Sequence, residues 1–162
     1  HRKSIDLDLF GELNMEIFDL ILEIKKIASI QQIKNTPNIH IYLIDGVKVD
    51  IVNYSYPWID ELISTDGLRL AGLKDIAAMK IGAVTGRGSR KDFVDIYYLL
   101  QHFSVQEMMK FYLEKYSDGS EFLAIKSLMY FEDAEQEPMP DMFEDVEWKH
   151  IKKVIMNACN KY

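Results

Sequence analysis

The spacing of apolar residues changes near residue 72, and this change constrains the fold of the chain more than any other feature. Before it, runs such as residues 4–10 and 47–54 alternate between apolar and polar positions, which is the period of a half-buried strand. After it, apolar residues recur every three or four positions, as in amphipathic helices. We therefore predict an α+β fold, with a sheet region at residues 1–71 and a helical region at residues 72–162 in the same compact unit.

Turn and capping residues divide these regions into elements. Residues 39–43 and 47–54 flank Asp45-Gly46, and Asp-Gly between two β-rich runs predicts an antiparallel hairpin. A helix is expected at residues 15–30 with Asn14 as its cap. A short strand is expected at residues 68–70, further helices at residues 73–84, 91–102, 106–116, 121–130 and 148–160, and a loop or lightly ordered connector at residues 133–145.

Composition narrows the functional classes. The 162 residues carry a formal net charge of −7, which does not favour a large nucleic-acid footprint. Cys159 is the only cysteine, so an internal disulfide and a cysteine-based zinc cluster are excluded and a reducing compartment is favoured. No run approaches the roughly 20 apolar residues that cross a bilayer. We expect a cytoplasmic protein with no membrane partner.

Three aspartates are candidates for metal binding. Asp6 and Asp8 stand one residue apart on the polar face of the first predicted strand, so both can reach one hard cation. Asp50 is a charged residue in an otherwise apolar strand and can supply a third ligand. Three carboxylates on neighbouring strands suit magnesium-dependent phosphoryl transfer. The alternative at this point is a solvated strand face with an accidental acidic pair.

Cationic residues in the helical region are candidates for phosphate binding. Lys80 lies on the apolar stripe of its predicted helix and requires an anionic partner, either a nucleotide phosphate or one of the three aspartates, unless it extends past the core edge to water. Arg87, Arg90 and Lys91 lie in or beside a short loop that opens a helix, and helix N-termini favour anions. Asp92, like Asp95 three residues later, suits either a site role or simple capping and arginine pairing.

Four segments, in this order and at this spacing, resemble the AbiEii/AbiGii-type nucleotidyltransferase toxin family. They are Arg2-Lys-Ser-Ile-Asp-Leu-Asp-Leu-Phe10, Gly46-Val-Lys-Val-Asp50, Leu73-Lys-Asp-Ile-Ala-Ala-Met-Lys80 and Arg90-Lys-Asp-Phe-Val-Asp-Ile-Tyr97. They are distributed across residues 2–97, and the helical remainder is similar in general character. The resemblance implies a polymerase-β-like nucleotidyltransferase fold, in which a mixed sheet carries the catalytic aspartates and a helical C-terminal part follows.

The resemblance also implies roles for single residues. It implicates Asp6, Asp8, Asp50 and Asp92 in catalysis, the first three of them as ligands of Mg2+, and Ser4, Lys80, Arg87 and Arg90 in nucleotide binding. Asp95 is implied to hold Arg90 or a neighbouring helix. The Gly-Gly or Gly-Ser element that usually precedes the Asp-x-Asp strand in this family is absent from the sequence, as though an upstream element is missing. We therefore expect the 162 residues by themselves to be inactive.

The activity implied is transfer of a nucleotide from an NTP to an acceptor hydroxyl, with RNA as a possible acceptor. The family also implies a toxin with a cognate antitoxin protein. Two alternatives stay open. One is a non-catalytic interaction module of degenerate nucleotidyltransferase fold, and the other is a small-molecule adenylyltransferase of the antibiotic-modifying kind.

Overall fold

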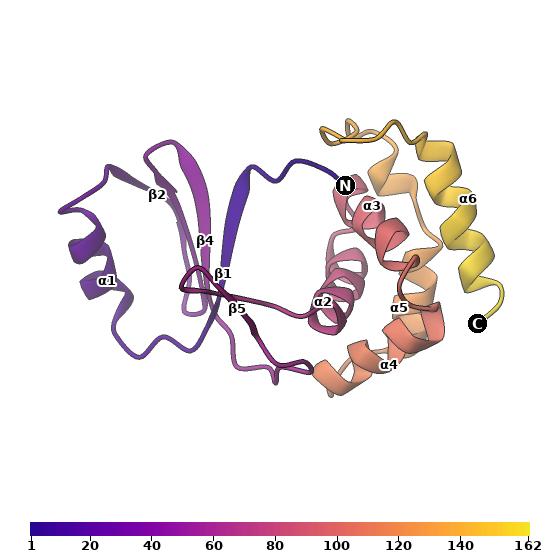
Figure 1. The fold of residues 1–162 in the computed structure, drawn as a ribbon, viewed down its shortest axis with the longest axis horizontal. Helices are drawn as coiled ribbons and strands as arrows, with labels where there is room; N and C mark the ends of the chain where they lie inside the picture. The colour runs from indigo at the N-terminus through magenta and orange to yellow at the C-terminus, as the bar shows by residue number, and fades with distance from the viewer. The chain divides into compact units, whose positions relative to one another are not determined.

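The computed structural model describes all 162 residues, and their contacts divide them into two compact units (Figure 1). The sheet unit consists of residues 4–55. The helical unit consists of residues 56–162 together with residues 1–3. Residues 56–71, which composition places with the sheet region, contact the helices. Residues 1–3 do the same, although the first strand begins only a few residues later.

The sheet unit contains four strands and one helix. These are β1 (Asp6–Gly11), α1 (Ile17–Ile24), β2 (Ile30–Asn35), β3 (Ile39–Ile44) and β4 (Val47–Asn53). The strand order is β1-β4-β3-β2, with β1 parallel to β4 and the other neighbours antiparallel, so the mixed sheet is confirmed. The predicted hairpin is also confirmed. Asp45 and Gly46 both have positive φ angles, 47° and 83°, as a tight turn between β3 and β4 requires.

One face of the sheet packs against α1. Tyr42, Val49 and Ile51 project from this face and are buried with Ile21 of the helix. Because side chains alternate along a strand, Lys48 and Asp50 project from the opposite face. The apolar residues of β4 therefore fix which of its polar residues face away from the core.

The helix predicted at residues 15–30 is shorter than expected. It begins at Ile17 after a Glu16 cap that makes no side-chain hydrogen bond, so the prediction of Asn14 as the cap is wrong. It ends at Ile24, and residues 30–35 form β2. The apolar residues of β2 are three positions apart, a spacing that also suits a helix, and antiparallel pairing with β3 determines the outcome.

The helical unit begins with a small hairpin and continues as helices. Its elements are β5 (Ile63–Thr65), β6 (Leu68–Leu70), α2 (Leu73–Gly86), α3 (Arg90–Leu99), α4 (Val105–Lys115), α5 (Glu121–Leu128), the 3-10 helix η1 (Glu132–Ala134) and α6 (Trp148–Cys159). All five helices predicted here are confirmed to within two or three residues at each end. Ser104 and Glu107 form a capping box that starts α4. No helix of the chain has both the length and the apolar character needed to cross a membrane.

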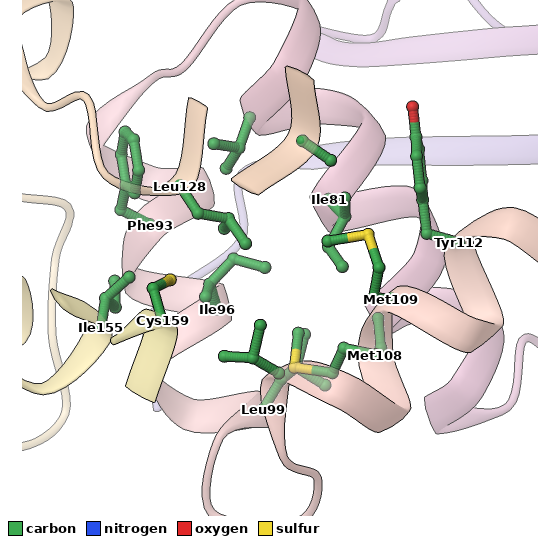
Figure 2. Packing of buried hydrophobic residues seen from close by; sticks show 14 of the residues in the cluster. Ile81, Phe93, Ile96, Leu99, Met108, Met109, Tyr112, Leu128, Ile155 and Cys159 are labelled. Carbon is green, nitrogen blue, oxygen red and sulfur yellow. The ribbon is translucent and has the colours of Figure 1, made fainter. Parts of the chain in front are cut away.

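A single apolar core joins the helices of this unit. Figure 2 shows Ile81 of α2 among side chains from the other helices, including Ile96, Met109 and Leu128. Ile81 is fully buried and Ile96 is 1% exposed. This packing holds the end of α2 and the start of α3 in a fixed relation, and these two segments carry the predicted phosphate-binding residues.

A buried ion pair holds the start of the helical unit in place. Lys115 Nζ donates to Asp75 Oδ1 at 2.6 Å and to the carbonyl oxygen of Pro57 at 2.7 Å. The side chains of Lys115 and Asp75 are fully buried. Asp75 also accepts from the backbone N–H groups of Ile59 and Asp60. Burial alone would raise the pKa of Asp75, but these bonds together hold it below its ordinary value.

Candidate active site

Three carboxylates and one lysine form a block on the sheet face opposite α1. In the parallel pairing of β1 with β4, Asp8 lies beside Asp50 and Asp6 lies beside Lys48. Residues paired in register project from the same face. The structure therefore places the three predicted metal-binding residues on one face of two neighbouring strands, together with Lys48.

Lys48 contacts two of these carboxylates, those of Asp50 and Asp6. Its Nζ lies 2.5 Å from Asp50 Oδ1 and 3.8 Å from Asp6 Oδ2. The three side chains are partly open to solvent, with exposed fractions of 36% for Lys48, 22% for Asp6 and 19% for Asp50. The ammonium group thus lies where a cation shared by Asp6 and Asp50 would lie.

The chemistry of this donor set fits a hard divalent cation. Carboxylate oxygens are the ligands that Mg2+ takes from proteins. With the side chains as they stand, no group of three or more carboxylate, histidine or cysteine side chains is arranged to hold a metal ion. The positively charged ammonium group of Lys48 marks the place of a cation. The predicted roles of Asp6, Asp8 and Asp50 as metal ligands stay predictions, as does nucleotide binding by Ser4, whose hydroxyl donates to the Asp6 carbonyl oxygen at 3.3 Å.

A second cluster of charges lies in the helical unit, around Lys80. Its Nζ lies 2.6 Å from Asp95 Oδ2 and 3.5 Å from Asp92 Oδ1. The sequence predicts an anionic partner for this inward lysine, either a nucleotide phosphate or one of the three sheet aspartates. The structure instead pairs it with two other aspartates, both on α3. The Lys80 side chain keeps 23% of its surface exposed, so it is still accessible to a further anion.

Asp92 is fully buried and its oxygens are held by several donors. Arg87 donates from Nε to Oδ2 at 2.7 Å and from Nη2 to Oδ1 at 2.9 Å, and the Ser89 hydroxyl donates to Oδ2 at 2.7 Å. Burial alone would raise the pKa of Asp92, but Arg87, Ser89 and Lys80 together lower it. The carboxylate is therefore ionised and fixed in place.

Asp95 fastens the first residues of the chain to α3. Arg2 donates from Nε at 2.7 Å and from Nη2 at 2.8 Å, so the pair is bidentate. His1 Nε2 lies 2.8 Å from Asp95, and its ring stacks on Tyr98 at 4.3 Å. Burial would raise the pKa of Asp95, but Arg2 and Lys80 lower it. Of the two expected roles of Asp95, a contact with a neighbouring helix is confirmed, because it pairs with Lys80 of α2. The contact with Arg90 is wrong, because the arginine that Asp95 binds is Arg2.

Arg90 holds the segment around η1. It donates from Nε to the Ala134 carbonyl at 2.9 Å and from Nη2 to the Glu135 carbonyl at 2.7 Å. The guanidinium carbon also lies 4.8 Å from the ring centroid of Trp148, and only 11% of the side chain is exposed. Through these contacts the Arg90 side chain stabilises the fold around η1. The phosphate contact predicted for Arg90 stays a prediction.

Lys48 and Arg2 belong to these clusters, although the sequence prediction gave neither of them a role. Lys48 shares a strand face with Asp50, and the two-residue period shows this, so its contact could have been inferred. Arg2 and Asp95 are 93 positions apart, and no local pattern connects them. A cavity of about 620 Å³ also lies in the helical unit, lined by residues that include His102, Val105 and Ala158, and it contains no predicted site residue.

A mixed sheet with carboxylates on two neighbouring strands, together with a helical part, is the architecture of a nucleotidyltransferase-like protein. Two solved structures from Helicobacter pylori share the fold at low identity: JHP933, with a TM-score of 0.53 and 19% identity, and a protein described as a candidate nucleotidyltransferase, with a TM-score of 0.52 and 18% identity. Both matches cover 99% of this chain, and they cover 78% and 81% of the respective H. pylori chains.

The family follows from a direct sequence match. Residues 1–158 match the model of the nucleotidyl transferase AbiEii toxin family of type IV toxin–antitoxin systems, and the chain belongs to this family. An uncharacterized protein of Aquifex aeolicus (strain VF5), aq_aa25, is 32% identical over 170 residues. That match covers all of this chain and 81% of the relative.

Proposed function

We propose that this protein transfers a nucleotidyl group from an NTP to an acceptor hydroxyl, with Asp6, Asp8 and Asp50 as ligands of Mg2+. The observation that supports it most is the register of β1 and β4, which places the three carboxylates on one sheet face in a chain of the AbiEii family. A solvated, purely structural strand would not require three like charges at adjacent positions.

Each of these residues then has a defined task. When bound, the metal ion supplies positive charge for the triphosphate and acidifies the acceptor hydroxyl. Asp6, Asp8 and Asp50 would hold it, and Asp50 would also help to activate the acceptor. The acceptor oxygen forms a bond to the α-phosphorus, the bond from that phosphorus to the bridging oxygen breaks, and pyrophosphate leaves with the electron pair. The acceptor proton passes to a carboxylate and then to water.

For the helical unit, taken by itself, we propose that Lys80 and Arg87 bind an anion such as a nucleotide phosphate. Arg2, Lys80 and Arg87 carry three positive charges against the two negative charges of Asp92 and Asp95, so the cluster keeps a positive excess. The Arg87 side chain is 58% exposed and is accessible to an anion. Asp92 contributes as a positioning residue, because it fixes the guanidinium of Arg87 through two hydrogen bonds.

The acceptor and the biological role belong to the same proposal. RNA is the acceptor that we propose, with Arg87 and Lys91 as a small basic patch suited to a short RNA end and not to a long duplex. The protein would act as the toxin of its pair, and a cognate antitoxin protein would bind it. The family description supports this role.

Label transfer tests the proposal. The full-length gene product is incubated with each α-labelled NTP, Mg2+ and total RNA, beside Asp8→Ala and a control, Asp19→Ala, which removes an exposed aspartate from α1 of the same unit. We expect labelled RNA with the unchanged protein and with Asp19→Ala, and none with Asp8→Ala. No transfer by any of the three would contradict the catalytic proposal and favour an interaction module. A parallel incubation contains an aminoglycoside as well as RNA. Label on the aminoglycoside and not on the RNA would show that the acceptor is a small molecule.

A further inference from the structure

Lys48 contacts two of the three carboxylates proposed as metal ligands, although the proposed reaction assigns it no task. Its ammonium group lies 2.5 Å from Asp50 and 3.8 Å from Asp6, and both distances lie within the sheet unit. A cation at this point reduces the repulsion among three carboxylates on adjacent strands. Lys48 therefore does, in the folded protein, part of what a divalent cation would do there.

We propose that Lys48 is an internal counter-ion that holds the metal position and leaves it when a divalent cation binds, so that the site binds bare metal weakly and metal–nucleotide tightly. This inference rests on the proposed function, because it takes Asp6, Asp8 and Asp50 as the ligands. It assigns to Lys48 a positioning role that couples binding of the metal to binding of the nucleotide.

The contacts of Lys48 are weak enough for its ammonium group to move away from the carboxylates. More than a third of its side chain is exposed, and salt bridges this open to water contribute little to stability. A lysine also carries its charge on a flexible four-carbon stem and makes no fixed bidentate contact. The ammonium can therefore leave Asp50 without loss of a strong interaction.

The direction of the coupling follows from the charges. A divalent cation at this block lies next to the positive charge of Lys48, which opposes its binding. A triphosphate bound to the same cation brings negative charge that the displaced ammonium can contact. Bound nucleotide should therefore increase the affinity for the metal ion more in the unchanged chain than in a variant that lacks Lys48. By thermodynamic linkage, the bound metal ion should increase the affinity for the nucleotide by the same factor.

The sheet provides a matched control for this test. Lys34 of β2 is paired in register with Ile41, which is paired in turn with Asp50, so Lys34 projects from the same face at the far side of the sheet. Replacing Lys34 or Lys48 by methionine removes the same charge from the same face. A general electrostatic effect would appear in both variants, whereas displacement by the metal involves Lys48 alone.

Binding of Mn2+ followed by electron paramagnetic resonance tests the inference without any catalytic readout. We expect Lys48→Met to bind bare Mn2+ about tenfold more tightly than the unchanged chain, and Lys34→Met to differ by less than about twofold. A non-hydrolysable NTP analogue should then strengthen Mn2+ binding less in Lys48→Met than in the unchanged chain. Lys48→Gln serves as a second variant, and circular dichroism checks that each protein is folded.

The outcomes separate this inference from the proposed function. If Lys48→Met binds Mn2+ no more tightly than the unchanged chain, while Asp8→Ala weakens binding, the role of Lys48 is refuted and the metal site stands. If Mn2+ binds equally to the unchanged chain and to Asp8→Ala, or to none of the proteins, the metal ligands are wrong and both proposals fail.

Discussion

The two charged clusters use the same residue types in opposite ways. In the helical unit, Asp92 and Asp95 are buried, and each is held by an arginine and by Lys80. In the sheet unit, Asp6 and Asp50 keep about a fifth of their surface exposed and contact the ammonium group of Lys48. Carboxylates with every oxygen held by protein donors maintain a structure. Carboxylates that are partly exposed and share one lysine remain able to bind a further cation.

The comparison is tested most strongly by Asp92→Ala. The change removes the fully buried carboxylate that Arg87 and Lys80 share, and breaking a buried pair from one side costs about 3–5 kcal/mol. The loss should lie near the lower end of that range, because the Arg87 side chain is 58% exposed and Lys80 keeps its contact with Asp95. We expect a loss of this size in the free energy of unfolding, measured by urea denaturation. A loss below about 1 kcal/mol would show that Asp92 is not held as firmly as its contacts suggest.

A smaller loss is expected for Arg90→Ala. Arg90 holds the carbonyl groups of Ala134 and Glu135 and packs on Trp148, so its removal should cost about 2 kcal/mol. Nucleotide affinity, measured by isothermal titration calorimetry, should change little. A large loss of nucleotide affinity at unchanged stability would show that Arg90 binds a phosphate of the nucleotide.

Acid should weaken the helical cluster in a defined pH range. The pKa values of Asp92 and Asp95 in the folded chain lie below the ordinary value of 3.8. Their contribution to stability is therefore complete above that value and is lost as the pH falls below it through their folded pKa values. Thermal unfolding between pH 6 and pH 2.5 should show this fall in the unchanged chain and a smaller fall in Asp95→Asn. Parallel curves for the two proteins would contradict the assignment.

The smallest effect on stability is expected for Asp8→Ala. Asp8 is exposed on the edge strand β1, and removing it reduces repulsion with Asp50, its neighbour in register. The free energy of unfolding should change by less than about 0.5 kcal/mol in urea denaturation. Metal binding should nevertheless be lost. A large destabilisation would mean that the sheet cluster is structural, like the helical one.

The sequence was sufficient for features that depend on local chemistry. The hairpin at Asp45-Gly46 requires positive φ angles that these residue types tolerate, and the helices after Gly72 follow from strong apolar periods. It was insufficient for β2, whose apolar spacing suits a helix as well as a strand. It was also insufficient for most partners. The contact between Arg2 and Asp95 spans 93 positions and depends on the whole fold.

For the candidate site, the sequence predicted that Asp6 and Asp8 share a strand face and that Asp50 lies on another strand of the sheet. The register of β1 with β4, which the sequence did not predict, shows that the three share one face. The sequence did not predict how deeply each aspartate is buried. Asp92 and Asp50 are both aspartates within helical or strand patterns, yet one is fully buried and the other is partly exposed. That difference arises from tertiary packing, and it separates a positioning residue from a proposed metal ligand.

The central claim is that the sheet carboxylates, and not the helical ones, take a divalent cation. The most direct measurement is the anomalous diffraction of Mn2+ in crystals of the protein soaked with Mn2+ and a non-hydrolysable NTP analogue. We predict an anomalous peak bordered by the carboxylates of Asp6, Asp8 and Asp50, with Lys48 Nζ moved away from Asp50. A peak beside Asp92 and Asp95, or no peak at the sheet carboxylates, would contradict the claim.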